Sequence, residues 1–239
     1  MLAERAADLE SLNALARERV LALPDGRPLV FVPARAQRGA LAYERCIAAH
    51  GEIATRPGNL HDTLNALMWL AFPRTKAALN ALHVEEALTG TANARSERRD
   101  AATLLDESGL ILACADEELV ALLRDHAWRT LFWTRRDDVA WRMRPMVIGH
   151  GLAAKLLQPF RALTAKVLVV PVESSALPEG DTALTRFDLA AAMAVADPGF
   201  GPACLTPLPV AALPGWSNEG LGERLFDDVS VFRPRMLVY

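Results

Sequence analysis

The segment from Asn59 to His83, NLHDTLNALMWLAFPRTKAALNALH, constrains the fold more than any other part of the chain. It is apolar on most sides, a pattern typical of a helix that is buried nearly all round. When the segment is wound at about 100° per residue, its polar side chains fall on one stripe, flanked by Trp69 and Phe72. This polar stripe consists of His61, Asn65, Lys76, Asn80 and His83. A buried helix must direct such a stripe into protein or into a cleft.

Two interpretations of the polar stripe follow from the cost of burial. A buried polar group without a partner costs about 1–3 kcal/mol, so the stripe must find partners. In the first interpretation it is a structural hydrogen-bond network that ties two layers of the fold together. In the second it is the floor of a ligand-binding or catalytic site, because polar groups that converge in an apolar pocket are typical of such sites. The residues alone leave both interpretations open.

Pro73 predicts a break in the middle of this segment. Proline removes a helical hydrogen-bond donor and disfavours helical backbone at Phe72 before it. In a straight helix His61 and His83 would lie about 33 Å apart and could not share a ligand. If the chain folds back at Phe72–Pro73, the two histidines become level across a helical hairpin. We expect a break that folds the chain back, with a wide kink as the alternative.

Shorter patterns elsewhere predict a helix-rich α+β fold with a few short strands. Further helices are expected over residues 3–22, 39–50, 116–126, 127–135, 137–158 and 181–196. Strands are expected over residues 28–33, 52–56 and 166–173, a β-hairpin over 101–114 with its turn at 106–109, and an edge strand at 229–234. We expect residues 1–239 to form one domain, with helix 3–22 at its periphery and residues 200–239 mostly in extended coil.

Composition excludes several classes of protein. The net charge of −3 argues against a general nucleic-acid binder, which should carry a basic stripe. No run of about 18 apolar residues is free of charge, so no membrane span is expected. The N-terminal residues are interspersed with acidic side chains and do not resemble a signal peptide. Cys46, Cys114 and Cys204 are too widely spaced for a zinc motif or a disulfide framework. We therefore expect reduced thiols and a cytoplasmic protein.

Candidate site residues come from the polar stripe and from the segment after it. Histidines and carboxylates that could hold a metal are His61, His83, His126, His150, Asp62, Asp100 and Asp106, although no compact H-x-x-x-H pair occurs. Arg95, Arg98 and Arg99, in a loop beside Lys76 and Asn80, suit an anionic ligand. The alternative is a solvated loop in which these arginines pair with neighbouring acids. The nucleotide-binding and hydrolase glycine motifs are absent.

Three further features have both a structural and a functional interpretation. Asp106 and Glu107 are either turn residues or ligand or catalytic carboxylates. Gly149 and Gly151 interrupt a helical pattern and could bring the backbone close to a ligand, but we interpret them as sites of close helix packing. His150 between them is interpreted as a core histidine rather than a catalytic one.

These features lead to two hypotheses about function. In the first, the protein is a small-molecule enzyme or binding protein for an anionic metabolite, and the most concrete version is hydrolysis of a phosphorylated or acylated compound. His61 or His83 would be general base or metal ligand, and Asp100 or Asp106 would orient it. The ligand would be held by Asn65, Lys76, Asn80, Arg98 and Arg99. In the second hypothesis the protein is a non-catalytic structural or protein-interaction domain. The residues identify no cofactor.

The residues of the central segment also resemble a known family. They form the pattern H-D-x-x-N-x-x-x-W-x-x-F-P-x-x-K-x-x-L-N from His61 to Asn80. Further residues that carry the resemblance are Arg99–Asp100, Asp106–Glu107 with Gly109, Gly149–His150 with Lys155, 164–166, 214–216 and 231–234. Together they are similar to an uncharacterised, chiefly proteobacterial family that is catalogued as a domain of unknown function. The resemblance implies a single cytoplasmic bacterial domain and implies no activity, cofactor or partner.

Overall fold

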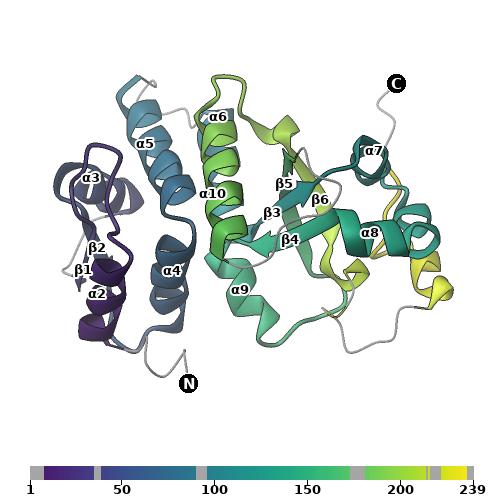
Figure 1. The fold of residues 1–239 in the computed structure, drawn as a ribbon, viewed down its shortest axis with the longest axis horizontal. Helices are drawn as coiled ribbons and strands as arrows, with labels where there is room; N and C mark the ends of the chain where they lie inside the picture. Colours follow the sequence, from purple (N-terminus) through teal and green to yellow (C-terminus); the bar gives the residue numbers. More distant parts are fainter. Residues whose placement is uncertain are drawn as a thin grey trace.

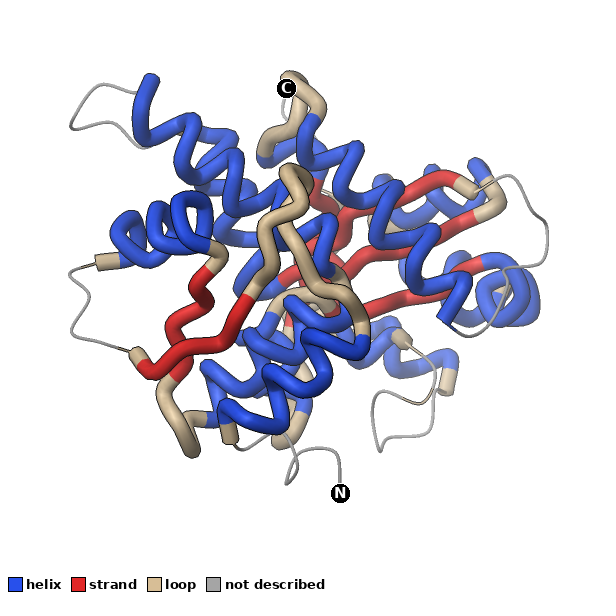
Figure 2. The backbone as a smooth tube through the Cα atoms, turned by 60° about the vertical axis from the view of Figure 1, so that its left-hand side comes forward, coloured by secondary structure: helices blue, strands red, loops and turns tan. Residues whose placement is uncertain are grey.

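The computed structural model describes residues 8–34, 39–89, 96–172, 181–213, 215 and 222–235. It is helix-rich and contains two separate sheets, as Figure 2 shows, so the predicted α+β class is confirmed. In Figure 1 the smaller sheet and its helices lie on the left and the larger sheet lies on the right. Helices α4 (Leu60–Ala71) and α5 (Pro73–Thr89) run between these two parts.

The smaller part is built on a parallel pair of strands, β1 (Val30–Pro33) and β2 (Glu52–Thr55). Helix α3 (Ala40–His50) connects them, and helix α2 (Leu9–Glu18) packs on β1. Gly51 ends α3 with a φ of 70°, and a Cβ there would lie 2.3 Å from the carbonyl oxygen of Pro28. Only glycine fits this position. Both predicted strands and the predicted helix between them are confirmed.

The predicted break at Phe72–Pro73 is confirmed, but the chain does not fold back there. Phe72 has a φ of −128° and a ψ of 55°, which is outside the helical region. Figure 1 shows α5 continuing beyond α4 along a bent line, so the expected helical hairpin is wrong. A hairpin needs a loop of about 2–5 residues, whereas one residue separates these helices.

A buried carboxylate from a distant helix fixes the start of α5. Asp188 belongs to α10 (Asp181–Ala196), and its side chain is 1% exposed. Its carboxylate oxygens accept hydrogen bonds from the backbone N–H of Arg74 at 3.0 Å and of Thr75 at 2.8 Å. The hydroxyl of Thr75 also donates to this carboxylate, at 2.8 Å. Asp188 therefore satisfies N–H groups that the first turn of a helix leaves without partners.

The larger sheet has the strand order β4-β3-β5-β6. Its strands are β3 (Gly109–Cys114), β4 (Met143–Val147), β5 (Thr164–Pro171) and β6 (Leu205–Pro209). The central strands β3 and β5 are parallel, and both edge strands are antiparallel to their neighbours. Every residue of β3 is buried. Strand β3 is therefore the centre of the core, covered on both of its faces.

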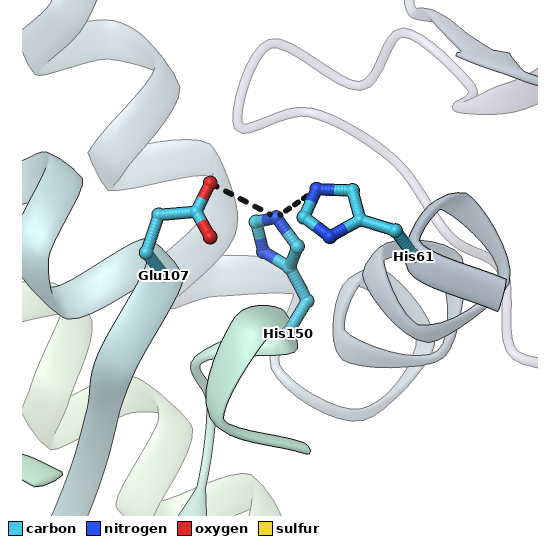
Figure 3. A group of neighbouring side chains, drawn as sticks. All are labelled: His61, Glu107 and His150. Atoms are coloured by element: carbon cyan, nitrogen blue, oxygen red, sulfur yellow. Dashed lines mark hydrogen bonds and ion pairs between the residues drawn. The ribbon is translucent and has the colours of Figure 1, made fainter. Parts of the chain in front are cut away.

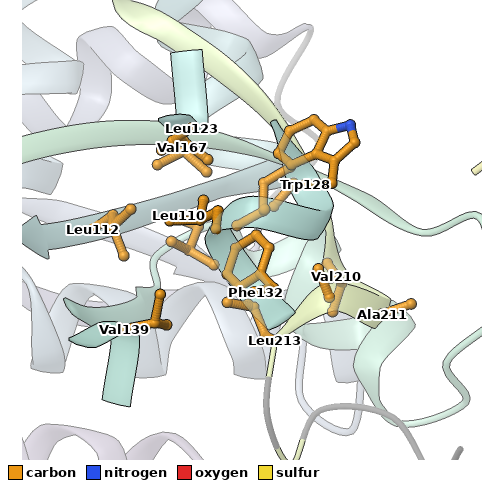
Figure 4. Close-up of a cluster of buried hydrophobic side chains, with 14 of the residues drawn as sticks. Leu110, Leu112, Leu123, Trp128, Phe132, Val139, Val167, Val210, Ala211 and Leu213 are labelled. Carbon is orange, nitrogen blue, oxygen red and sulfur yellow. The ribbon is translucent and has the colours of Figure 1, made fainter. Parts of the chain in front are cut away.

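Alternate residues of β3 enter two different apolar clusters. Leu110 and Leu112 pack with Trp128 and Phe132 on the face covered by α7 (Glu117–Arg124) and α8 (Arg136–Arg142), as Figure 4 shows. Ile111 and Ala113 pack on the other face with side chains from α5, α6 (Glu97–Ser108) and α10. The alternation is the one expected of a strand buried on both sides.

The β-hairpin predicted over residues 101–114 is wrong. Helix α6 occupies the first half of this range and strand β3 occupies the second. The side chain of Ser96 caps α6 by accepting a hydrogen bond from the backbone N–H of Arg99. Ala101, Ala102 and Leu105 are fully buried on one side of the helix. The residues interpreted as a turn, 106–109, are instead the last turn of the helix and the first residue of the strand.

The helix predicted over residues 137–158 is also wrong, because the chain forms α8, β4 and α9 (His150–Leu156) there. Pro145 lies in β4, an edge strand whose outer side needs no N–H donor. The C-terminal residues were expected to be mostly extended coil. Their described part contains β6 and the 3-10 helices Pro202–Cys204, Val210–Ala212 and Glu223–Asp227. The edge strand predicted at 229–234 is wrong, since these residues form turns and coil.

The helix predicted over residues 3–22 is shorter than expected, because α2 ends at Glu18, and residues 3–7 lie outside the described residues. The other predicted elements are confirmed with small shifts. Residues 116–126 contain α7, and residues 127–135 contain a π-helix at Thr130–Thr134. Strand β5 and helix α10 lie where they were predicted. No helix among the described residues combines the length and the hydropathy of a membrane span.

Candidate metal centre

Three side chains from three helices meet between the two parts of the molecule. His61 is the second residue of α4, Glu107 lies in the last turn of α6, and His150 is the first residue of α9. Figure 3 shows the imidazole of His150 between the other two side chains. The helices that carry them are in contact, because α9 packs against both α4 and α6.

Two glycines allow His150 to come this close to α6. A Cβ at Gly149 would lie 2.3 Å from the backbone nitrogen of Gly109. A Cβ at Gly151 would lie 2.7 Å from Oε2 of Glu107 and 2.9 Å from its carbonyl oxygen. Both distances are shorter than van der Waals contact, so a larger residue on either side of His150 would push α9 away from α6. The interpretation of these glycines as close-packing sites is confirmed.

The three side chains have the spacing of metal ligands. One donor atom from each of His61, Glu107 and His150 lies within 4.8 Å of the other two. Nε2 of His150 is 3.0 Å from Nε2 of His61 and 3.4 Å from Oε1 of Glu107. Two ligands of a tetrahedral zinc ion, each about 2.0 Å from it, lie about 3.3 Å apart. The distances from His150 to His61 and to Glu107 are therefore close to the separation of two ligands on one small divalent ion.

The centre is open to solvent on one side. His150 is buried, the side chain of Glu107 is 47% exposed and His61 is exposed. A hydrogen bond from His150 holds the pKa of Glu107 below its usual value, although partial burial opposes this effect. Glu107 is therefore ionised at neutral pH and is able to act as an anionic ligand.

A second carboxylate, Asp106, lies behind His150. Its Oδ2 is 3.7 Å from Nδ1 of His150, and its Oδ1 pairs with the ammonium group of Lys76. Burial raises the pKa of Asp106, but the charges of Lys76, His150 and His83 outweigh burial and hold this pKa below its usual value. Asp106, predicted as a catalytic or orienting residue, thus lies beside the centre as a stable anion.

The middle of the polar stripe is paired within the protein, with Lys76 and Asn80 buried and Asn65 half-buried. Nζ of Lys76, which is 4% exposed, donates a hydrogen bond to Oδ1 of Asn65 at 2.8 Å. The amide of Asn65 in turn donates to the hydroxyl of Tyr43 in α3 at 2.8 Å. Asn80 donates to the carbonyl oxygen of Glu44 at 2.9 Å and to its Oε2 at 2.6 Å. These residues have the partners that the structural interpretation of the stripe requires.

The ends of the stripe differ from its middle. His83 is buried, and its charge acts on Asp106, whereas His61 is exposed and lies at the candidate centre. The inward orientation predicted for the stripe is therefore confirmed for Asn65, Lys76, Asn80 and His83 and wrong for His61. His61 and His83 have different neighbours and do not form one pair.

Other predicted site residues lie elsewhere. Arg98 pairs with Glu86 at 2.8 Å, and Arg95 lies outside the described residues. Arg99 contributes its charge near Glu44 of α3. Asp100 is exposed in the first turn of α6. In the part of the chain that the structure describes, none of Arg98, Arg99 and Asp100 belongs to the group of metal-ligand geometry.

Two of the remaining metal candidates are engaged in other contacts. Asp62 pairs with Arg56 at 2.7 Å and is not part of the centre, although it follows His61 directly. His126 stacks on Trp128, with ring centroids 4.8 Å apart. Neither belongs to the metal-ligand group found among the described residues.

Sequence reasoning undervalued two of the three ligand candidates. The sequence places His150 among the possible metal ligands but favours a core histidine, and it leaves Glu107 open as either a turn residue or a ligand or catalytic carboxylate. The signal that could have found them is the pair of glycines around His150, because a histidine held so close to another helix is positioned with unusual precision. The sequence does not predict α6, the helix that carries Glu107, because this segment also fits a β-hairpin.

No curated protein and no solved structure matches this chain. A family model described as "Protein of unknown function (DUF3025)" matches residues 29–236, which is most of the chain. The predicted resemblance to a family of unknown function is thereby confirmed. The protein belongs to the DUF3025 family.

Proposed function

We propose that the protein binds a divalent transition-metal ion through His61, Glu107 and His150 and uses it to hydrolyse a small-molecule substrate. The observation that carries this proposal is the convergence of two imidazoles and one carboxylate within 4.8 Å. Two histidines and one carboxylate are a ligand set of catalytic zinc sites and of related iron sites.

The exposure of the ligands supports a catalytic rather than a structural ion. Structural zinc sites are closed by four protein ligands, whereas catalytic sites keep a position open. His61 and Glu107 both face solvent, so the position opposite the buried His150 is accessible. A divalent ion held in this way acts as a Lewis acid and lowers the pKa of bound water to about 7.

The charges around the centre favour an anionic substrate. Glu107 supplies one negative charge, and the charge of Asp106 is compensated by its pairing with Lys76. A divalent ion in this setting leaves the site with net positive charge. We therefore retain the inference, first drawn from the sequence, that the substrate is a small phosphorylated or acylated metabolite.

The second candidate function is a structural or protein-interaction domain without catalysis. The observation in its favour is the complete pairing of Asn65, Lys76 and Asn80 with protein groups. These residues are better explained as supports of the fold than as ligand-binding groups. Under this hypothesis the two histidines and Glu107 would bind no ion.

Metal titration separates the two functions. We expect the purified wild-type protein to bind one Zn²⁺ or Co²⁺ per chain in competition with a chromophoric chelator. Replacing one of three ligands, in His61→Ala, should weaken binding at least about 100-fold, since a lost ligand costs more than a lost supporting contact. His50→Ala removes another exposed histidine, in α3, and should bind as the wild type does. Equal metal affinity of His61→Ala and His50→Ala would contradict the proposed metal centre.

Activity is tested separately on the metal-loaded protein. Hydrolysis of p-nitrophenyl phosphate and p-nitrophenyl acetate covers the phosphorylated and acylated classes. Activity towards one of them that is lost in His61→Ala and kept in His50→Ala supports the hydrolase. Metal binding without either activity argues against hydrolysis of these two classes.

Two further proposals concern the cellular location of the protein and the range of its family. Cys114 and Cys204 are free thiols, which suits a reducing compartment, so we propose that the protein works in the cytoplasm. Its pattern from His61 to Asn80 supports a bacterial, chiefly proteobacterial, range for the family.

A further inference from the structure

One nitrogen of His150 is left without a hydrogen-bond partner. Nδ1 is buried and unpaired, while Nε2 faces Glu107 and His61. An unpaired buried donor is costly, so this atom needs an acceptor whenever it carries a proton. Oδ2 of Asp106 lies 3.7 Å from Nδ1, slightly beyond hydrogen-bond length.

Asp106 is held in place from its other side. Its Oδ1 pairs with Lys76, and Lys76 donates to Asn65, which donates to Tyr43. The ammonium group of Lys76 also lies 5.5 Å from the centroid of the Trp69 ring. This series of contacts from α3, α4 and α5 fixes one carboxylate oxygen and leaves the other directed at His150.

We propose that Asp106, fixed by Lys76, is the positioning residue of the metal centre. Its carboxylate accepts a hydrogen bond from the Nδ1–H of His150 when the metal ion is bound at Nε2, and it thereby favours the tautomer whose Nε2 lone pair faces the ion. Metal-bound histidines commonly donate their second N–H to a carboxylate in this way. This inference rests on the proposed metal centre and explains why a buried lysine and aspartate lie behind one of its ligands.

A purely structural ion pair would have different consequences. Lys76 and Asp106 would then stabilise the contact between α5 and α6 without any effect on the imidazole of His150. Loss of the pair would lower the stability of the fold and leave metal affinity unchanged. The tautomer of His150 and the metal affinity are therefore the measurements that distinguish the two roles.

The first measurement needs no substitution. Nitrogen-15 NMR of protein labelled in its histidine side chains reports which ring nitrogen carries the proton. In the Zn²⁺-loaded wild type we expect His150 to be protonated on Nδ1 and bound through Nε2, with assignment by His150→Gln. A zinc-bound His150 coordinated through Nδ1 overturns the inference, and so does a failure of the wild type to bind zinc, which overturns the metal centre as well.

The second measurement compares two aspartates. Asp106→Asn should weaken Zn²⁺ binding about 10- to 100-fold, the usual effect of losing such a supporting carboxylate. Asp62→Asn is the matched control, because Asp62 adjoins the ligand His61 but pairs with Arg56. The Zn²⁺ affinity of this variant should stay within about threefold of that of the wild type. Wild-type affinity in Asp106→Asn, with the His61→Ala effect intact, overturns the role of Asp106 alone.

Discussion

Glu44 illustrates how burial changes the chemistry of a single side chain next to the polar stripe. Burial raises the pKa of this carboxyl to about 7, and the nearby charge of Asp106 adds to the effect. The hydrogen bond from Asn80 and the charge of Lys76 oppose it and do not cancel it. Near neutral pH, Glu44 is therefore a carboxyl close to its midpoint of titration.

This pKa predicts a pH-dependent cost in stability. Because the folded pKa of Glu44 is about 7 and its ordinary value is 4.5, the protonated group stabilises the fold below pH 4.5, and this contribution is lost as the pH rises to about 7. Glu44→Gln cannot ionise. Relative to this variant, the free energy of unfolding of the wild type should fall by about 1–3 kcal/mol over that pH range.

Urea denaturation at the two ends of the range measures this difference. Glu18→Gln, an exposed position in α2, is the control and should follow the wild type at every pH. Parallel stability curves for the wild type and Glu44→Gln would contradict the raised pKa of Glu44.

At the scale of the elements, the sequence predicts the helices and strands that are marked by capping residues or by an uninterrupted aliphatic run. Asn59 and Gly51 mark the start of α4 and the end of α3, and the run of aliphatic residues in 167–170 marks β5. Helix α6 was missed because two apolar runs on either side of Asp106–Gly109 are equally compatible with a hairpin. The packing of α6 against α5 and α9 favours the helix over the hairpin, and this packing cannot be read from the sequence.

The close approach of α9 to α6 predicts a strict requirement for Gly149. Gly149→Ala places a Cβ 2.3 Å from a backbone nitrogen, which side-chain movement cannot relieve. We expect a loss of about 2–4 kcal/mol in the free energy of unfolding, similar to other severely overpacked sites. Gly201→Ala is the control, because no atom lies within 4 Å of the added Cβ, and it should change stability by less than about 0.5 kcal/mol. Equal stability of the two variants would refute the close approach.

At the scale of the whole molecule, the candidate centre lies where the smaller part of the fold meets the larger sheet and its helices. His61 comes from a helix between the two parts, whereas Glu107 and His150 come from helices beside the sheet. The sequence predicted that a polar stripe would be buried, which holds for its middle. It could not predict the centre, because ligands far apart in the chain are brought together only by tertiary packing.

Diffraction from crystals soaked in Zn²⁺, with data collected at the zinc absorption edge, tests the central claim most directly. We predict one anomalous peak about 2.0–2.2 Å from Nε2 of His61, Nε2 of His150 and a carboxylate oxygen of Glu107. The absence of a peak there, or zinc bound only at other surface groups, would contradict the claim that these three residues form a metal centre.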